Sequence, residues 1–278
     1  MNPIKSLQDT FTLHNGVTMP YVGLGVYKMT NEEEAYTAMM SAIDTGYRLI
    51  DTAAFYDNEH IVGKAVRDHS INRQDLFVTS KVWNSDQGYD ETLRAFEQSL
   101  KQLNMDYLDL YLVHWPVKGK YKETWRALER LYREGVVRAI GVSNFHIHHL
   151  EDLLTNSMEK PVINQVELHP YLSQVPLRNY CQKNNIAIEA WSPLARNRLA
   201  DEPVLNQLAK KYGKSVAQII LRWHLQHQTI IIPKSVHPER IQENANLFEF
   251  ELTSEDMKQI DALNNNERFG ADPDHFDF

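Results

Sequence analysis

The stretch Arg48-Leu-Ile-Asp-Thr-Ala-Ala-Phe-Tyr56 begins as a short apolar strand and ends in a turn. Asp51 lies at the end of this strand, and Tyr56 lies in the turn that follows. It is unusual for a carboxylate and a phenol to lie so close together at the end of a strand. If a lysine and a histidine lie at the ends of the next strands, the four side chains form a site that can deliver a proton. The fold and the function of the chain therefore depend on what the neighbouring strands carry at their ends.

Strands and helices alternate along the chain. Short apolar segments are expected as strands at 21–26, 48–53, 76–83, 108–114, 137–143, 162–169, 186–193 and 229–234. Apolar spacing, N-cap residues and C-terminal glycines predict helices at 31–46, 58–69, 90–103, 122–134, 148–155, 175–184, 203–212, 215–227 and 238–248. Eight strands, each followed by at least one helix, predict a parallel sheet, and eight such units favour a closed (β/α)8 TIM barrel.

The two ends of the chain fall outside this alternation. Asn15-Gly16, between two short β-like segments, predicts an N-terminal β-hairpin that caps the barrel. Extra helices are expected near the C-terminus, the last of them at 254–263. No linker or repeat interrupts the pattern, so residues 1–278 are expected to form a single domain, with 265–278 as an acidic, irregular tail.

The composition is that of an ordinary globular protein. Hydrophobic residues make up 42% of the 278 positions and charged residues 24%, and the formal net charge is −8. This negative charge disfavours nucleic acid or an anionic membrane as a partner. The single cysteine, Cys181, permits no internal disulfide, and the sequence carries neither a signal-peptide pattern nor a long apolar segment. We expect a cytoplasmic monomer.

Polar residues lie at the ends of three consecutive predicted strands. Asp51 and Tyr56 follow the second strand, Lys81 lies near the end of the third, and His114 ends the fourth. In a (β/α)8 barrel the carboxyl ends of the strands meet at one face, where the active site lies. There a lysine ammonium stabilises a phenolate and lowers the pKa of the tyrosine, while an aspartate keeps the buried lysine charged. The group can protonate an oxygen that develops negative charge, as carbonyl reduction requires.

Eight motifs make the chain resemble the aldo-keto reductase family over essentially its whole length. They are GLGVYK (23–28), IDTAAFY (50–56), TSKVW (79–83), LDLYLVHWP (108–116), IGVSNF (140–145), NQVELHP (164–170), AWSPL (190–194) and IPKSVHPERIQEN (232–244). The nearest likeness is to the bacterial glyoxal/methylglyoxal reductase and 2,5-diketo-gluconate reductase branch. It implies NADPH-dependent reduction of small aldehydes and ketones, such as glyoxal, methylglyoxal or keto-sugars, to alcohols. It also implies Tyr56 as the general acid, tuned by Lys81 and Asp51, with His114 orienting the carbonyl.

The cofactor site is not of the Rossmann type, because Gly23-Leu-Gly25 lacks the third glycine and the helix start. A lysine, an arginine and a helix N-terminus instead follow the eighth strand, which suits an anion. The resemblance implies NADPH/NADP+ as the cofactor. Its 2′-phosphate and adenine would contact Lys234, Ser235, Arg240, Glu243 and Asn244. Its nicotinamide end would contact Gly25, Val26, Tyr27, Ser143, Asn144, Gln165 and Trp191. Further cofactor contacts are expected from Asp51, Ser192, Pro193 and Leu194.

Aromatic residues at strand ends predict the wall of a substrate pocket. Tyr27, Trp83 and Trp115 should form this wall around His114, which supplies a polar corner. The short loops at 115–121 and 194–202 predict an open pocket for small or varied carbonyl compounds. The sequence leaves open whether Phe276 and Phe278 of the tail fold over it.

Two other functions are compatible with parts of the sequence. A barrel that binds NADPH as a sensor would need little turnover, which an intact set of catalytic residues disfavours. A metal-dependent hydrolase would need a ligand set. His146-Ile-His148-His149 resembles one, but neither an HExxH motif nor a cysteine cluster accompanies it. We therefore expect no metal site.

Overall fold

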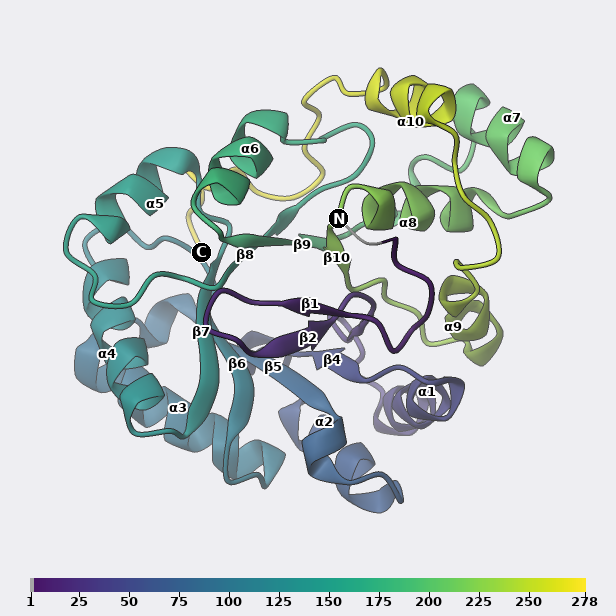
Figure 1. Cartoon of the computed structure of the whole chain (residues 1–278). Coiled ribbons are helices and arrows are strands. Elements are labelled where there is room, and N and C mark those ends of the chain that lie inside the picture. The colour runs from purple at the N-terminus through teal and green to yellow at the C-terminus, as the bar shows by residue number, and fades with distance from the viewer. Residues whose placement is uncertain (1–2) are drawn as a thin grey trace.

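The computed structural model describes residues 3–278 and contains an eight-stranded parallel sheet curled into a barrel (Figure 1). Each strand pairs in parallel with the next one along the chain. In order the strands are β3 (Leu24–Gly25), β4 (Leu49–Asp51), β5 (Phe77–Val82), β6 (Leu108–Val113), β7 (Val137–Ser143), β8 (Ile163–Glu167), β9 (Ala187–Trp191) and β10 (Ile230–Ile231). The predicted (β/α)8 barrel is confirmed.

The barrel closes between its first and last strands. Val22 forms a parallel bridge with Ile231, and the Gly23 N–H donates a hydrogen bond to the Ile231 carbonyl at 2.8 Å. A glycine is needed beside this seam, because a Cβ at Gly25 would lie 2.7 Å from the Ile232 carbonyl oxygen. Pairing across the seam is sparse. For this reason β3 and β10 are shorter than the predicted strands 21–26 and 229–234.

Helices surround the barrel (Figure 1). They are α1 (Glu32–Thr45), α2 (Glu59–Asp68), α3 (Tyr89–Leu103), α4 (Tyr121–Arg133), α5 (Ile147–Leu154), α6 (Val175–Lys183), α7 (Pro203–Tyr212), α8 (Val216–Gln226), α9 (Pro238–Ala245) and α10 (Ser254–Asp261). Nearly all lie within a residue or two of the predicted ranges. The exception is α9, which ends three residues early because the Gln218 amide donates hydrogen bonds to the carbonyls of Glu243 and Asn246.

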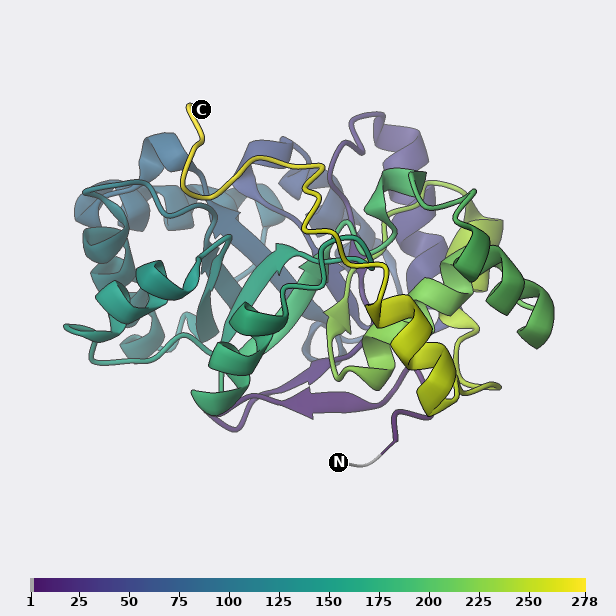
Figure 2. The same ribbon diagram turned by 90° about the horizontal axis from the view of Figure 1, so that it is seen from above.

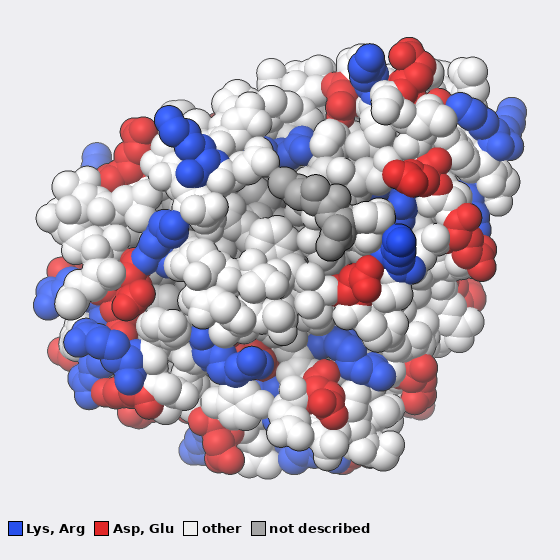
Figure 3. Space-filling model, in the orientation of Figure 1, with Lys and Arg blue, Asp and Glu red and all other residues white. Residues whose placement is uncertain are grey.

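The two ends of the barrel are covered differently. The predicted hairpin is present, with β1 (Thr10–Thr12) paired antiparallel to β2 (Thr18–Pro20). Figure 2 shows this hairpin at one end of the barrel and the C-terminal segment across the opposite end. On the hairpin face, acidic and basic side chains are both spread around the periphery (Figure 3). Among residues 3–278, no helix is long and apolar enough to cross a membrane.

The strands are buried on both faces, as is usual for a parallel sheet enclosed by helices. Every residue of β5 and of β6 is buried. Apolar residues occupy most of these positions, and they form one continuous core with the helices. Charged side chains that point into such an interior need partners, because burying an unpaired charge is very unfavourable. Lys81, which is 0% exposed, is the clearest case.

Candidate active site

Lys81 lies at the centre of a hydrogen-bonded group at the carboxyl ends of β4 and β5. Its Nζ donates to Asp51 Oδ1 at 2.6 Å, to the Thr52 carbonyl at 2.8 Å and to the Tyr56 hydroxyl oxygen at 3.3 Å. Three acceptors match the three ammonium hydrogens, so the buried charge is fully compensated. The Tyr56 oxygen accepts a hydrogen bond from Lys81. The tyrosine's own hydrogen therefore remains available to a substrate.

A short 3-10 helix, η1 (Ala54–Tyr56), places Tyr56 beside the lysine. It ends at Asp57, whose φ of 54° is left-handed, and the chain then turns into α2. The buried Asn58 fixes this turn, because its Nδ2 donates to the Val26 carbonyl at 2.9 Å and its Oδ1 accepts the Thr52 hydroxyl at 2.7 Å. From the sequence, Asn58 was predicted only as the first residue of a helix. Its side chain instead links the loop after β3 to the turn that carries Tyr56.

Burial raises the pKa of Tyr56 to about 12, and the nearby Lys81 charge offsets only part of this effect. The net shift is therefore opposite to the sequence-based prediction, although the lysine contribution has the predicted sign. Burial is the largest single influence on the pKa of Lys81 and lowers it, but Asp51, Tyr56 and Glu189 together outweigh burial and the net shift is upward. At neutral pH the tyrosine is thus protonated and the lysine charged, the states required of a proton donor and its supporting cation.

His114 follows β6 (Leu108–Val113) and lies edge-on to Tyr56, with 5.8 Å between the ring centroids. Burial, assisted by the Lys81 charge, holds the pKa of His114 well below its usual range, so the ring is neutral. Its Nδ1 is buried and has no hydrogen-bond partner among residues 3–278. Because a buried N–H without an acceptor is unfavourable, the proton belongs on Nε2. In this tautomer the ring can donate a hydrogen bond to a carbonyl oxygen.

Side chains from β7 to β9 form the opposite side of the site. Ser143 Oγ donates to the Gln165 carbonyl at 2.8 Å. Asn144 Nδ2 donates to the His114 carbonyl at 3.0 Å, and Trp191 Nε1 donates to Asn144 Oδ1 at 2.8 Å. Asn144 adopts a left-handed φ of 63°, which turns its amide toward its neighbours. The residues predicted for the nicotinamide end are thus brought together.

Other residues predicted to contact the cofactor lie around this group or next to it in the sequence. Gly25 pairs in register with Asp51, and the Val26 N–H donates to the Asp51 carbonyl at 3.1 Å. Tyr27 lies beside Tyr56, with 5.0 Å between their ring centroids. Ser192, Pro193 and Leu194 directly follow β9 (Ala187–Trp191).

Gln165 joins the two sides through a carboxylate that the sequence did not identify. Its Nε2 donates to Asp51 Oδ2 at 2.7 Å and to Glu189 Oε2 at 2.8 Å. Both carboxylates are buried, and within residues 3–278 only Asp51 forms an ion pair with Lys81. Burial, together with the Asp51 charge, raises the pKa of Glu189 to about 8. The sequence did contain a signal for Glu189. It lies two residues before Trp191 on a strand, so the two side chains face the same side of the sheet.

The residues predicted for the phosphate end lie apart from this group, after β10. Lys234 and Arg240 are exposed, and neither side chain makes a hydrogen bond or an ion pair within the described part of the chain. Ser235 is buried, and its Oγ accepts the His237 N–H at 3.1 Å. Two free cations at the N-terminus of α9 fit a phosphate group. Glu243 and the buried Asn244 lie further along the same helix.

Aromatic side chains surround the group formed by Tyr56, Lys81 and His114. The Trp83 ring lies edge-on to His114, with centroids 5.1 Å apart. Phe55, which the sequence did not suggest, stacks on Trp83 at 3.8 Å. Trp115 is buried beside them and Tyr27 is 42% exposed. The structure therefore places all the predicted wall residues at one mouth of the barrel.

The C-terminal segment completes this aromatic rim. Phe278 stacks on Trp83 with centroids 5.8 Å apart and planes at 6°, and both Phe276 and Phe278 lie 5.2 Å from Trp115. The question left open by the sequence is answered, since the tail does fold over the rim. The short loops had predicted an open pocket. For the rim this prediction was wrong, because the C-terminal segment packs there. The length of the loops does not indicate whether a segment distant in sequence covers them.

The chain is similar to known proteins over nearly its whole length. The sequence profile of the Aldo/keto reductase family matches residues 21–265. The glyoxal reductase of Bacillus subtilis (strain 168) is 58% identical over 273 residues, which cover 98% of this chain and 99% of the relative. The methylglyoxal reductase DkgA of Escherichia coli (strain K12) is 46% identical over 268 residues, 95% of this chain and 96% of the relative. A crystal structure of a Gox0644 mutant in complex with NADPH superposes with a TM-score of 0.93 at 43% identity, covering 98% of this chain and 99% of that one.

Proposed function

Because the chain belongs to the aldo/keto reductase family, we propose that it reduces small aldehydes and ketones, such as glyoxal and methylglyoxal, to alcohols with NADPH. The observation that carries this proposal is the hydrogen-bonded group around Lys81. It leaves the Tyr56 hydroxyl hydrogen free at the mouth of a barrel, beside a neutral histidine. Keto-sugars are a further substrate class for the same chemistry.

The donor set fits NADPH. Lys234, Ser235 and Arg240 would hold the 2′-phosphate, since the two cations are free and lie at a helix N-terminus. Ser143, Asn144 and Gln165 offer the donors and acceptors that a carboxamide needs, and Trp191 offers an aromatic face. When bound, the cofactor supplies the hydride that reaches the carbonyl carbon.

The protein's own residues handle the proton. Tyr56 donates its hydroxyl hydrogen to the carbonyl oxygen, where negative charge develops. Lys81 already contacts the phenolic oxygen, so its charge stabilises the phenolate that remains. Asp51 keeps Lys81 charged, and His114 donates a second hydrogen bond that orients the same carbonyl oxygen.

The proposal is tested by following NADPH oxidation against a panel of small aldehydes, dicarbonyl compounds and sugars. We expect turnover of methylglyoxal that requires NADPH and is unaffected by EDTA. NADPH binding without turnover of any carbonyl would instead indicate a sensor. Activity that is lost with EDTA and independent of NADPH would indicate a metal-dependent hydrolase.

We further propose that the protein is a single-domain monomer in the cytoplasm. Support comes from the one continuous core, which spans the barrel, and from Cys181, which is buried and free. Gel filtration with light scattering would test the monomer.

A further inference from the structure

Residues 269–278 of the C-terminal segment are held on the barrel by hydrogen bonds at three places. Near its start, the Glu167 carboxylate accepts hydrogen bonds from the backbone N–H groups of Phe269 at 2.7 Å and Gly270 at 3.0 Å. At its end, Asn84 Nδ2 donates to the Phe278 carbonyl at 3.0 Å. Between these two, Asp274 is the point at which the segment contacts α5 (Ile147–Leu154).

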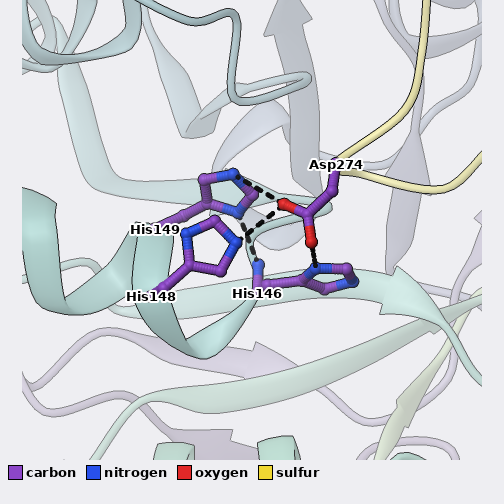
Figure 4. Close-up of side chains that lie close together, drawn as sticks. All are labelled: His146, His148, His149 and Asp274. Atoms are coloured by element: carbon purple, nitrogen blue, oxygen red, sulfur yellow. Dashed lines mark hydrogen bonds and ion pairs between the residues drawn. The ribbon is translucent and has the colours of Figure 1, made fainter.

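Three histidine rings from the start of α5 converge on the Asp274 carboxylate (Figure 4). His146 Nδ1 lies 2.9 Å from Oδ2, His148 Nε2 lies 2.7 Å from Oδ1, and His149 Nε2 lies 3.4 Å from Oδ1. The four ligand-type atoms all lie within 4.8 Å of one another. Two chemistries suit such a cluster: a metal ion held by bare nitrogens, or a carboxylate that accepts N–H groups.

The outer nitrogens of two rings decide between these chemistries. His149 Nδ1 faces the His146 backbone N–H at 3.0 Å, and His146 Nε2 faces an Arg268 guanidinium nitrogen at 3.1 Å. Both of these partners are donors, so the outer nitrogens accept and the nitrogens facing Asp274 carry the hydrogens. A metal-bound histidine has the reverse arrangement, because its outer N–H usually donates to an acceptor. His146 is therefore arranged as an N–H donor to the carboxylate, and the His149 N–H faces the same carboxylate at 3.4 Å.

This anchor lies next to the substrate pocket. Asp274 is only two residues before Phe276 and four before Phe278, the rings that pack on Trp115 and Trp83. After α10 (Ser254–Asp261) the segment contains no helix and only one isolated bridge, between Asp272 and His275. Its position therefore depends on side-chain anchors more than on its own backbone pairing.

We propose that Asp274, held by His146, His148 and His149, is a specificity-determining residue that positions Phe276 and Phe278 as the outer wall of the carbonyl pocket. The proposal rests on the proposed function, since it assigns that pocket to a carbonyl substrate. With the anchor in place, the aromatic wall leaves room for small carbonyl compounds. Without it, the wall moves away and bulky substrates reach His114 and Tyr56.

The test compares Asp274→Ala with Asp277→Ala. The control removes the same charge from the same segment, at an exposed residue that makes no side-chain hydrogen bond within residues 3–278. The quantity to measure is the ratio of kcat/KM for a bulky aromatic aldehyde, 2-naphthaldehyde, to that for methylglyoxal. We expect Asp274→Ala to raise this ratio about tenfold and Asp277→Ala to change it less than about twofold. A similar ratio in both variants would overturn the proposal. A general loss of stability would lower the activity toward both aldehydes together and leave the ratio unchanged.

A second measurement does not depend on catalysis. Hydrogen exchange of the peptide 268–278 should become at least about tenfold faster in Asp274→Ala, while exchange in β5 (Phe77–Val82) and β6 stays unchanged. His148→Ala should act in the same direction but more weakly, because the hydrogen bond from His146 to Asp274 remains. If the wild-type protein reduces no carbonyl, the proposed function fails, and the exchange data still decide whether Asp274 anchors the segment.

Titration of the wild-type protein with Zn2+ alone separates the two chemistries of the cluster. If the rings donate hydrogen bonds to Asp274, calorimetry at micromolar Zn2+ should detect no stoichiometric binding of the ion. Tight, one-to-one Zn2+ binding that Asp274→Ala abolishes would show that the cluster is a metal site and would overturn the anchor described above.

Discussion

The two ends of the proposed cofactor site differ in how far they are complete before any ligand binds. Around Lys81, each buried charge has a partner within the barrel, and the hydrogen bonds are 2.6–3.3 Å long. After β10, Lys234 and Arg240 extend into solvent without a partner in the described residues. The side chains of the first region are therefore fixed by contacts within the fold, whereas those two cations of the second are not.

The difference follows from the cost of burying charge. An unpaired charge inside the barrel would be strongly destabilising, so the catalytic residues must satisfy one another. An exposed cation is hydrated and stable alone, so it can remain free for a phosphate. Changes in the first region should therefore affect the chemical step and folding, and changes in the second should affect cofactor affinity alone.

The largest effect is expected from Tyr56→Phe. The change removes the hydroxyl hydrogen and keeps the ring that packs beside Tyr27. We expect kcat for methylglyoxal to fall by about 10²–10⁴-fold, the range usual for loss of a general acid, while the Kd for NADPH changes less than about twofold. Stopped-flow reduction and a fluorescence titration of NADPH would measure the two effects. Wild-type turnover in this variant would contradict the assignment of Tyr56 as the proton donor.

A smaller loss of activity, but a larger loss of stability, is expected from Lys81→Met. The phenolate loses its supporting cation, so kcat should fall by about 100-fold. Asp51 also loses its ionic partner, although Gln165 still donates to it, so the free energy of unfolding should fall by about 3–5 kcal/mol. Urea unfolding measures this quantity, and Lys64→Met, at an exposed ion pair, is the matched control. If the two variants were equally stable, the buried Lys81–Asp51 pair would contribute no more to the free energy of unfolding than an exposed ion pair does.

Glu189→Gln tests how the stability of the buried region depends on pH. Burial raises the pKa of Glu189 from its ordinary value of 4.5 to about 8. Between these values the unfolded chain releases the proton while the folded chain keeps it, so Glu189 makes stability fall as pH rises from about 4.5 to about 8. Glutamine does not titrate and keeps an oxygen to accept the Gln165 N–H. The variant should therefore gain a few kcal/mol relative to the wild type between pH 5 and pH 8.

Urea unfolding of both proteins at pH 5 and at pH 8 provides the measurement. Glu97→Gln, at an exposed position on α3, should show no such change with pH. If the difference between Glu189→Gln and the wild type is the same at both pH values, Glu189 does not hold a proton in the folded protein.

The same contrast explains what the sequence could predict. Asp51, Lys81 and His114 were found because each lies at or just after a strand end, and strand ends follow from local apolar patterns. Lys234 and Arg240 were predicted to bind phosphate because a helix start follows a strand there. Glu189 was missed because its importance comes from Asp51, which lies 138 positions away in the printed sequence but shares one amide with it. The contact between Asp274 and the histidines at 146–149 is equally non-local, so no pattern near either partner indicates it.

The smallest effect is expected from Arg240→Ala, at the exposed end of the comparison. Arg240 has no partner among residues 3–278, so its removal should leave the free energy of unfolding within about 0.5 kcal/mol. A charge-assisted hydrogen bond to the 2′-phosphate is worth about 1.5 kcal/mol, so kcat/KM for NADPH should fall about tenfold. NADH lacks that phosphate, so its kcat/KM should change little.

The matched control for this variant is Arg94→Ala, which removes an exposed arginine from α3, away from the cofactor residues. It should leave the ratio of kcat/KM for NADPH to that for NADH unchanged, whereas Arg240→Ala should lower it about tenfold. An unchanged ratio in Arg240→Ala would contradict the assignment of the 2′-phosphate to this patch. A lowered kcat with both cofactors would mean that the exposed region contributes to the chemical step after all, because an arginine that only binds phosphate should not alter a proton transfer from Tyr56.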